Sequence, residues 1–153
     1  MFIPIHDDNP LKVISFQRVT VGLIIANVLT FLWQTSLAPG EMIAADQAFG
    51  VVPAALVGGL PDFGAFPEEL ALLTYMFLHA DVWHLAGNML FLWVLGDNVE
   101  DDLGHLRYLA FYLLCGVAAA LLFSVLKPDS TVPLIGASGA TSGLVAAYLM
   151  LHP

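Results

Sequence analysis

The chain has 153 residues, of which 59% are hydrophobic and only 11% charged, and its mean hydropathy is +0.84. An ordinary soluble domain carries about 25% charged residues, so this composition indicates an integral membrane protein. The net charge of −9 leaves only 4 basic residues, which excludes nucleic acid as a partner because no basic face neutralises phosphates. Cys115 is the single cysteine, so no disulfide framework or cysteine-based metal site forms within the chain.

Residues 1–18 precede the first apolar run, and we expect them to form a cytoplasmic N-terminal segment. Residues 19–37 are long enough to cross a bilayer, which takes about 20 apolar residues. A cleaved signal peptide is the alternative, since Lys12 and Arg18 precede the run and S-L-A at 36–38 resembles a cleavage site. The run exceeds the ~7–15 apolar residues of such peptides, so we predict a retained membrane helix.

Residues 38–73 form the predicted first loop. Its central part, GVVPAALVGGLPDFGAFPEE, holds too many prolines and glycines to span a membrane, yet it is too apolar for a solvated linker. We therefore expect a loop that lies in the membrane interface, with no second domain in the chain.

Residues 82–99 and 106–126 are the second and third predicted spans. His84 and Asn88 are four residues apart, so on a helix they share one face. Because a polar side chain inside a span is costly, Asn88 is predicted to be functional, whereas His79, just before the span, taken alone is typical of an interfacial anchor.

Acidic residues gather at the end of the second span, at Asp97, Glu100, Asp101 and Asp102. We interpret them as the solvated cytoplasmic end of a helix. No metal site is predicted, because no His or Cys completes a ligand set.

The orientation follows from the basic residues, since positive charge favours the cytoplasm. Lys12, Arg18 and Arg107 fall on one side of the predicted spans and Lys127 on the other. The N-terminus is therefore predicted inside, with the first loop and residues 127–137 outside.

The fourth predicted span, residues 138–151, is short: its 14 residues rise about 21 Å, against a hydrocarbon core of about 30 Å. Such a helix begins below the membrane surface, where its unpaired N–H groups need a wet cavity. Ser138 stands at this point. A simple packing face is the alternative, with Gly139 and Gly143 as a small-residue pair, Ser142, Ala146 and Ala147 extending the face, and Ser138 as a helix cap.

His84, Asn88 and the backbone N–H of Ser138 supply three hydrogen-bond donors that can converge on a developing oxyanion. Amide hydrolysis needs such donors beside a nucleophile. The combination of H-x-x-x-N, GDNVEDDLG and GASGATSG, within residues 74–151, resembles the rhomboid family of intramembrane serine proteases.

The resemblance implies an all-α membrane helix bundle, with four transmembrane helices of a six-helix core in one membrane domain. It implies that Ser138 is the nucleophile, that His84 and Asn88 line the oxyanion site, and that His79 supports the site, with Gly136 and Gly139 flanking the serine. It also implies no cofactor, transmembrane proteins as substrates cut near the outer surface, and a multi-pass protein of the bacterial inner membrane with a cytoplasmic N-terminus.

The chain departs from the family pattern in three places. Asp102 stands where an arginine is common, and Leu70 and Ala71 stand near the place of a Trp-Arg pair. The family's catalytic base, a histidine on the sixth helix, has no counterpart. The remaining histidines do not replace it, because His6 and His105 are predicted on the cytoplasmic side and His152 about 21 Å along the helix from Ser138.

Three hypotheses follow from these residues. The first is the front part of a rhomboid protease, whose base lies outside this chain, so that the chain alone is inactive. The second is a non-catalytic rhomboid-like protein that binds transmembrane segments. The third is an unrelated four-helix scaffold or transporter subunit, which the lack of charged residues within the spans disfavours.

Overall fold

A computed structural model describes residues 10–61 and 66–152 as a bundle of helices. The sequence-predicted N-terminal segment lies outside the described residues for its first nine positions, His6 included. The helices, in chain order, are α1 (Arg18–Ser36), α2 (Pro39–Phe49), α3 (Pro53–Leu56), α4 (Glu68–Thr74), the 3₁₀ turn η1 (Tyr75–Phe77), α5 (Val82–Leu103), α6 (His105–Leu126) and α7 (Ser138–Leu151).

The all-helical prediction is confirmed for the part of the chain that the structure describes. Pairing between extended segments is limited there to an isolated bridge between Val51 and Leu134. The long helices match the expected spans within a few residues, and α5 extends past its predicted end to Leu103.

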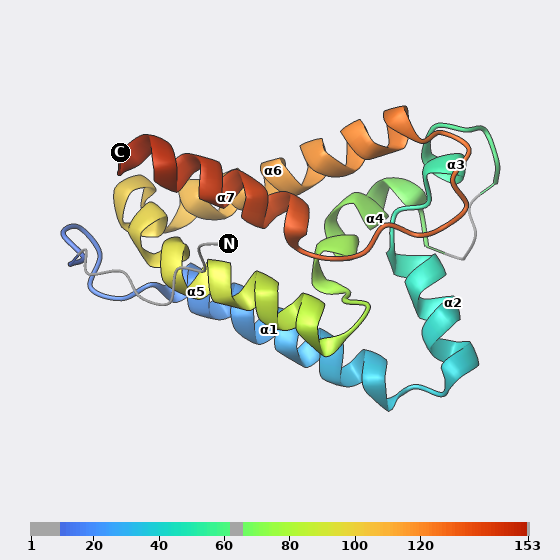
Figure 1. Cartoon of the computed structure of the whole chain (residues 1–153), viewed down its shortest axis with the longest axis horizontal. Coiled ribbons are helices and arrows are strands. Elements are labelled where there is room, and N and C mark those ends of the chain that lie inside the picture. Colours follow the sequence, from blue (N-terminus) through green and yellow to red (C-terminus); the bar gives the residue numbers. More distant parts are fainter. Residues whose placement is uncertain (1–9, 62–65, 153) are drawn as a thin grey trace.

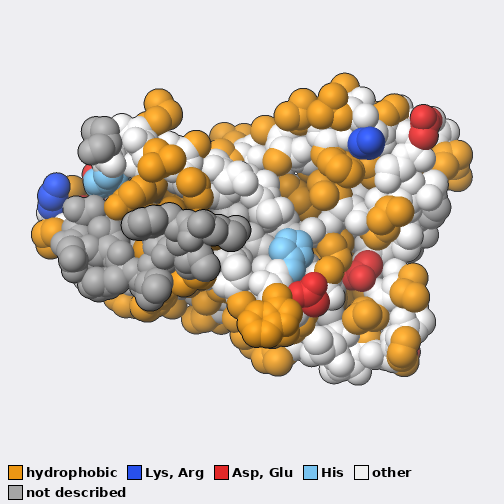
Figure 2. All heavy atoms as spheres, viewed as in Figure 1, with side chains coloured by type: hydrophobic (Ala, Val, Ile, Leu, Met, Phe, Trp, Pro, Cys, Tyr) orange, Lys and Arg blue, Asp and Glu red, His pale blue; other side chains and the backbone are white. Residues whose placement is uncertain are grey.

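Two of the described helices, α1 and α6, are long and apolar enough to cross a membrane, whereas α7 is apolar but shorter. Large hydrophobic side chains are exposed on α1 and α6, among them Leu29 and Leu32 on α1 and Leu114 and Val125 on α6. Figure 2 shows hydrophobic groups spread over the visible face, with charged groups at only a few places. A surface of this kind suits contact with lipid. The count of four spans remains a prediction.

The first loop contains short helices that the sequence analysis did not predict. Residues 39–49, 53–56 and 68–74 form α2, α3 and α4, each shorter than the about 20 residues that a span takes. In Figure 1 these helices gather at the end of the molecule opposite the C-terminal end of α7. Their inner side chains are buried, including Val51, Val52, Ala54 and Ala71. The position of this loop in the membrane interface stays a prediction.

The acidic end of α5 also differs from its prediction. Glu100 is fully buried and Asp101 is 5% exposed, so these acids do not form a solvated helix end. The carboxylate of Asp101 accepts the backbone N–H groups of Lys12, Val13 and Ile14 at 2.6–2.8 Å. Together, these bonds hold the start of the described chain against the end of α5.

Glu100 holds the first turn of α1 in the same way. Its carboxylate accepts the backbone N–H groups of Val19 and Thr20 and the Thr20 hydroxyl at 2.7–2.9 Å. An anion at a helix N-terminus pairs orphan donors and complements the helix dipole. Glu100 therefore fastens α1 to α5, and Asp101 fastens the segment before α1 to the same helix end. Asp102, by contrast, lies 2.9 Å from Nε2 of His152 and so links the ends of α5 and α7.

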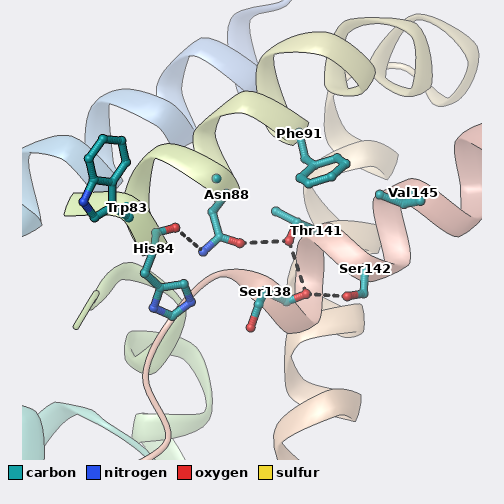
Figure 3. A pocket seen from close by; sticks show the side chains of 9 residues that line it. Trp83, His84, Asn88, Phe91, Ser138, Thr141, Ser142 and Val145 are labelled. Atoms are coloured by element: carbon teal, nitrogen blue, oxygen red, sulfur yellow. Dashed lines mark hydrogen bonds between the residues drawn. The ribbon is translucent and has the colours of Figure 1, made fainter. Parts of the chain in front are cut away.

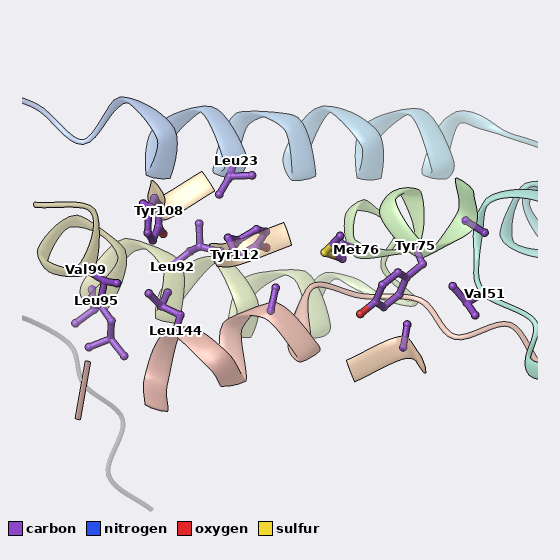
Figure 4. Packing of buried hydrophobic residues seen from close by; sticks show 14 residues of the cluster. Leu23, Val51, Tyr75, Met76, Leu92, Leu95, Val99, Tyr108, Tyr112 and Leu144 are labelled. Carbon is purple, nitrogen blue, oxygen red and sulfur yellow. The ribbon is translucent and has the colours of Figure 1, made fainter. Parts of the chain in front are cut away.

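The core lies where α1, α5, α6 and α7 meet η1 (Figure 4). Tyr75, Met76, Leu92, Tyr112 and Leu144 are at most 1% exposed. The Tyr75 hydroxyl donates to the carbonyl of Gly116 at 2.7 Å, which satisfies the polar end of a buried ring. This packing ties the first-loop helices to α6.

The start of α7 is placed by the first loop. The N–H and carbonyl groups of Val51 and Leu134 pair at 3.0 and 2.7 Å, and the N–H of Gly136 donates to the carbonyl of Tyr75 at 2.9 Å. These bonds draw residues 127–137 back along the bundle, so α7 begins part-way along the molecule (Figure 1). Ser138 is thus brought inward, beside α5.

Candidate active site

A cleft of about 430 Å³ opens between α5 and α7 (Figure 3). It contains three of the residues predicted from the sequence: Ser138, His84 and Asn88. The structure therefore brings these residues together, although α6 separates their helices in sequence. The cleft is lined by Trp83, His84, Gly87, Asn88, Phe91, Ser138, Thr141, Ser142 and Val145.

Ser138 is the first residue of α7, and its side chain is exposed in the cleft. The interpretation of Ser138 as a helix cap is wrong, because Ala137 holds the cap position and no side chain caps the helix. Within the described residues, no side chain hydrogen-bonds the Ser138 hydroxyl. Its hydroxyl is therefore exposed in the cleft, beside first-turn N–H groups that have no acceptor within the helix.

His84 belongs to the first turn of α5, and Asp81 explains why the helix begins there. The Asp81 carboxylate accepts the backbone N–H groups of Trp83 and His84 at 2.8 and 2.9 Å, as an N-cap. The same bonds, that from His84 foremost, lower the pKa of Asp81. A charged cap thus fixes the turn that carries the His84 imidazole.

Gly136 makes room for that imidazole. Its φ is +118°, a conformation that L side chains rarely adopt. A Cβ at this position would collide with Cε1 of His84 and come within 2.8 Å of Nε2. Only glycine therefore allows the chain before α7 to pass under the His84 ring.

Gly139 and Gly143 serve packing, as the alternative interpretation proposed. A Cβ at Gly139 would lie 2.6 Å from Cβ of Ala119, and one at Gly143 would lie 2.5 Å from Sγ of Cys115. Both glycines face α6 and let the two helices approach closely. The packing interpretation is wrong for Ser142, however, because Ser142 lines the cleft and is exposed there.

Asn88 is the centre of a buried polar network. Its amide nitrogen donates to the carbonyl of His84 at 3.0 Å and lies 3.2 Å from Nε2 of His79. Its amide oxygen accepts the hydroxyl of Thr141 at 3.0 Å. Asn88 is 6% exposed and Thr141 5%, so each bond replaces water that these groups have lost.

His79 lies between η1 and α5 and is 2% exposed, so the interpretation as an exposed interfacial anchor is wrong. Its backbone N–H donates to Oε1 of Gln34 at 3.0 Å, and its Nδ1 lies 3.3 Å from the carbonyl of Phe77. Burial, together with the neighbouring His84 ring, lowers the pKa of His79 to about 4. A neutral His79 donates from Nδ1 and accepts from Asn88 at Nε2.

The other described histidines lie away from the cleft. His105 pairs with Glu100, and His152 lies beside Asp102. The rings of His79 and His84, by contrast, stand edge to face, with 5.2 Å between the ring centroids. None of the described histidines hydrogen-bonds the hydroxyl of Ser138, so the described residues form no Ser-His dyad.

Sequence reasoning missed Thr141 as a site residue. The signal was available, because Thr141 follows Ser138 by three residues and so shares its helix face. Its hydroxyl also lies 3.2 Å from the carbonyl of Ser138. Ser142 bonds the same carbonyl at 2.7 Å. Trp83 and Phe91 were missed as cleft walls for a different reason: an aromatic residue in an apolar span carries no distinguishing signal.

Residues 67–153 match the family model described as the Rhomboid domain. The chain is 33% identical over 140 residues to the human presenilin-associated rhomboid-like protein, mitochondrial, covering 90% of this chain and 34% of that protein. It is 36% identical over 86 residues to the chloroplastic rhomboid-like protein 11 of Arabidopsis thaliana, covering 56% of this chain and 30% of that protein.

A bacterial relative is also similar. The rhomboid protease GluP of Bacillus subtilis is 41% identical over 82 residues, covering 54% of this chain and 16% of that protein. The chain spans about a third or less of the length of these relatives. No solved structure matches the chain.

Proposed function

The chain belongs to the rhomboid family of integral membrane proteins, and we propose that it is an intramembrane serine endopeptidase of rhomboid type with Ser138 as its nucleophile. The observation that carries the proposal is the exposed hydroxyl of Ser138 at the start of α7, in a cleft shared with His84 and Asn88. A bacterial relative named as a protease supports it. The substrates we propose are transmembrane segments of other proteins.

In the proposed reaction, Oγ of Ser138 attacks the carbonyl carbon of the scissile bond and gives up its proton. The carbonyl oxygen becomes an oxyanion, which the N–H groups at the start of α7 and the His84 ring would stabilise. One N–H of Asn88 would turn from the carbonyl of His84 toward the same oxygen. A base takes the Ser138 proton and passes it to the scissile nitrogen, so that the C–N bond breaks, the fragment with the new amino terminus leaves, and an acyl-enzyme remains. Water then attacks the acyl-enzyme, which releases the other fragment as a carboxylic acid and restores the Ser138 hydroxyl.

A serine hydroxyl attacks well only when a base takes its proton. We propose that this base is a group outside the described residues, because His79 is engaged with Asn88 and Phe77 and His84 faces Gly136. We accordingly expect a protein that lacks this group to react far more slowly with a serine-directed probe than one that contains it.

The cleft gives the proposed substrate an apolar and a polar side. Trp83, Phe91 and Val145 supply apolar wall, while the serine and its donors lie on the polar side. An extended segment that has left its own helix exposes backbone amides, which need such partners inside a membrane. The arrangement favours a segment unwound near the membrane surface over an intact helix.

The alternative is a rhomboid-like protein that binds transmembrane segments without cutting them. The missing hydrogen bond between any described histidine and Ser138 favours this alternative. The two functions differ in their products. Binding of a transmembrane segment without any cleavage product would favour the rhomboid-like binding protein.

The test is cleavage in liposomes. The protein, in the form that its gene encodes, is reconstituted with a fluorescent single-span membrane protein, and products are identified by mass spectrometry. We expect a cut within or beside the span, lost in Ser138→Ala and kept in Ser142→Ala. Ser142 is the matched control, because it is also exposed in the cleft but its hydroxyl is bonded to the Ser138 carbonyl. Equal cleavage by wild type and Ser138→Ala would refute the proposal.

A further inference from the structure

We propose that Thr141 is a positioning residue of the site, whose hydroxyl fixes the Asn88 amide with its N–H end toward the two histidines. The hydrogen bond from Thr141 Oγ1 to Asn88 Oδ1, 3.0 Å long, carries the inference. The meaning of this bond for catalysis rests on the proposed function. Its effect on Asn88 does not.

The bonds around Asn88 agree on one orientation of the amide. Thr141 donates to the oxygen end, and the nitrogen end has two acceptors, the carbonyl of His84 and Nε2 of His79. Since Nδ1 of His79 faces the carbonyl of Phe77, its proton belongs on Nδ1, and Nε2 is left as an acceptor. Donation therefore runs in a single direction, from Thr141 through Asn88 and His79 to Phe77.

Because these residues are buried, the loss of one hydrogen bond in this chain would change the others. Thr141, Asn88 and His79 are all at most 6% exposed, so a group that loses its partner has little water to replace it. Without the Thr141 hydroxyl, the amide oxygen would be buried with no donor from α7. The Asn88 side chain would then rotate toward water in the cleft and pull its N–H end away from His79.

Thr141 also couples the amide to the nucleophile. Thr141 lies in the first turn of α7, three residues after Ser138, and its hydroxyl proton goes to Asn88, while the carbonyl of Ser138 accepts the hydroxyl of Ser142 at 2.7 Å. A shift of α7 therefore moves the group that holds Asn88. One side chain thus sets the distance between the helix that carries the serine and the amide that we assign to the oxyanion site.

The first measurement is the nitrogen spectrum of His79. The protein is labelled with ¹⁵N-histidine in detergent micelles, and the His79 signals are assigned by their loss in His79→Gln. We expect the wild type to carry its proton on Nδ1 and an acceptor at Nε2. In Thr141→Val the Nε2 signal should shift as the Asn88 donor is lost, and Thr141→Ser should restore it. Thr74→Val is the matched control, because it removes a threonine hydroxyl that is bonded to Phe49, outside the cleft.

The second measurement is turnover of the membrane substrate. Thr141→Val should lower kcat about three- to tenfold, the equivalent of one neutral hydrogen bond, with little change in KM. Thr141→Ser should recover most of the rate. If Thr141→Val does not fold, Thr141→Ala, which adds no bulk, takes its place in both measurements.

The outcomes separate the two proposals. Unchanged His79 signals in a folded Thr141→Val would overturn the role of Thr141 even if Ser138 is active. Shifted signals in a protein that shows no Ser138-dependent reaction would leave the role of Thr141 in orienting Asn88 intact and refute the protease. Shifted signals with an undiminished rate in an active protein would overturn the importance of this orientation for the reaction.

Discussion

The His84 ring lies directly against Gly136, so close that a Cβ on the glycine would come within 2.8 Å of Nε2 of the ring. This contact joins the turn before α7 to the first turn of α5. It therefore holds the turn that leads into Ser138 against the helix that carries His84. The contact is possible only while residue 136 has no side chain.

Gly136→Ala should displace the His84 ring and strain the turn, because the new Cβ has neither space nor a favourable φ. Gly104→Ala separates these effects, since Gly104 also has a positive φ, +76°, but none of the described residues lies within 4 Å of its Cβ position. We expect Gly104→Ala to lose about 1–3 kcal/mol from backbone strain alone and to keep its reactivity. Gly136→Ala should lose more stability and most of its reactivity toward a fluorophosphonate. Equal stability and reactivity in the two variants would show that the His84 contact is unimportant.

Asn88→Ala should lower turnover of the membrane substrate about ten- to a thousandfold through loss of oxyanion stabilisation, while the fold survives. Asn27→Ala is the matched control. Asn27 is also a buried asparagine, but it donates to the carbonyl of Leu23 within α1. Rates are compared at saturating substrate, and thermal unfolding is measured on both variants. A drop in stability without a specific loss of turnover would mean that Asn88 is purely structural.

The stability of the protein should depend on the charge of His79. Its pKa falls from an ordinary 6.5 to about 4 because the ring is buried, so the folded state binds fewer protons than the unfolded state between these values. The stabilisation of the folded state that the neutral His79 ring contributes is fully present above about pH 6.5 and is lost as the pH falls toward 4. His79→Gln does not titrate. The difference in melting temperature between the two proteins should therefore change over this window, and a constant difference would contradict the buried, neutral ring.

The orientation in the membrane is a further prediction. The bridge between Val51 and Leu134 places the first loop and residues 127–137 on one side, and the basic residues predict that this side is outside. A cysteine at position 129, in a Cys115→Ala background, should react with an impermeant maleimide added to intact cells. Reaction only after the cells are opened would reverse the orientation and the outward access to Ser138.

Local spacing in the sequence predicted the long helices well. The span at residues 138–151 coincides with α7, and the four-residue spacing of His84 and Asn88 placed both in the cleft. These features depend on helical periodicity and on apolar length, which a single segment carries. The same holds for the small-residue pair, Gly139 and Gly143, that lets α7 approach α6.

Contacts between segments that are distant in the sequence could not be predicted from local spacing. Glu100 and Asp101 look like solvated acids until the backbone of residues 12–20, about eighty positions away, is packed against them. Thr141 and Asn88 are 53 residues apart. The short helices of the first loop were not predicted for a related reason, because helices of this length are stabilised by tertiary packing rather than by their own sequence.

Reaction of Ser138 with a fluorophosphonate probe tests the central claim most directly. The probe is applied to the gene-encoded protein in micelles, and the labelled residue is identified by peptide mass spectrometry. The account predicts that the wild type and Ser142→Ala are labelled at Ser138, and that Ser138→Ala is not labelled. A folded wild type that remains unlabelled, or a label that persists at another residue in Ser138→Ala, would contradict the assignment of Ser138 as the nucleophile.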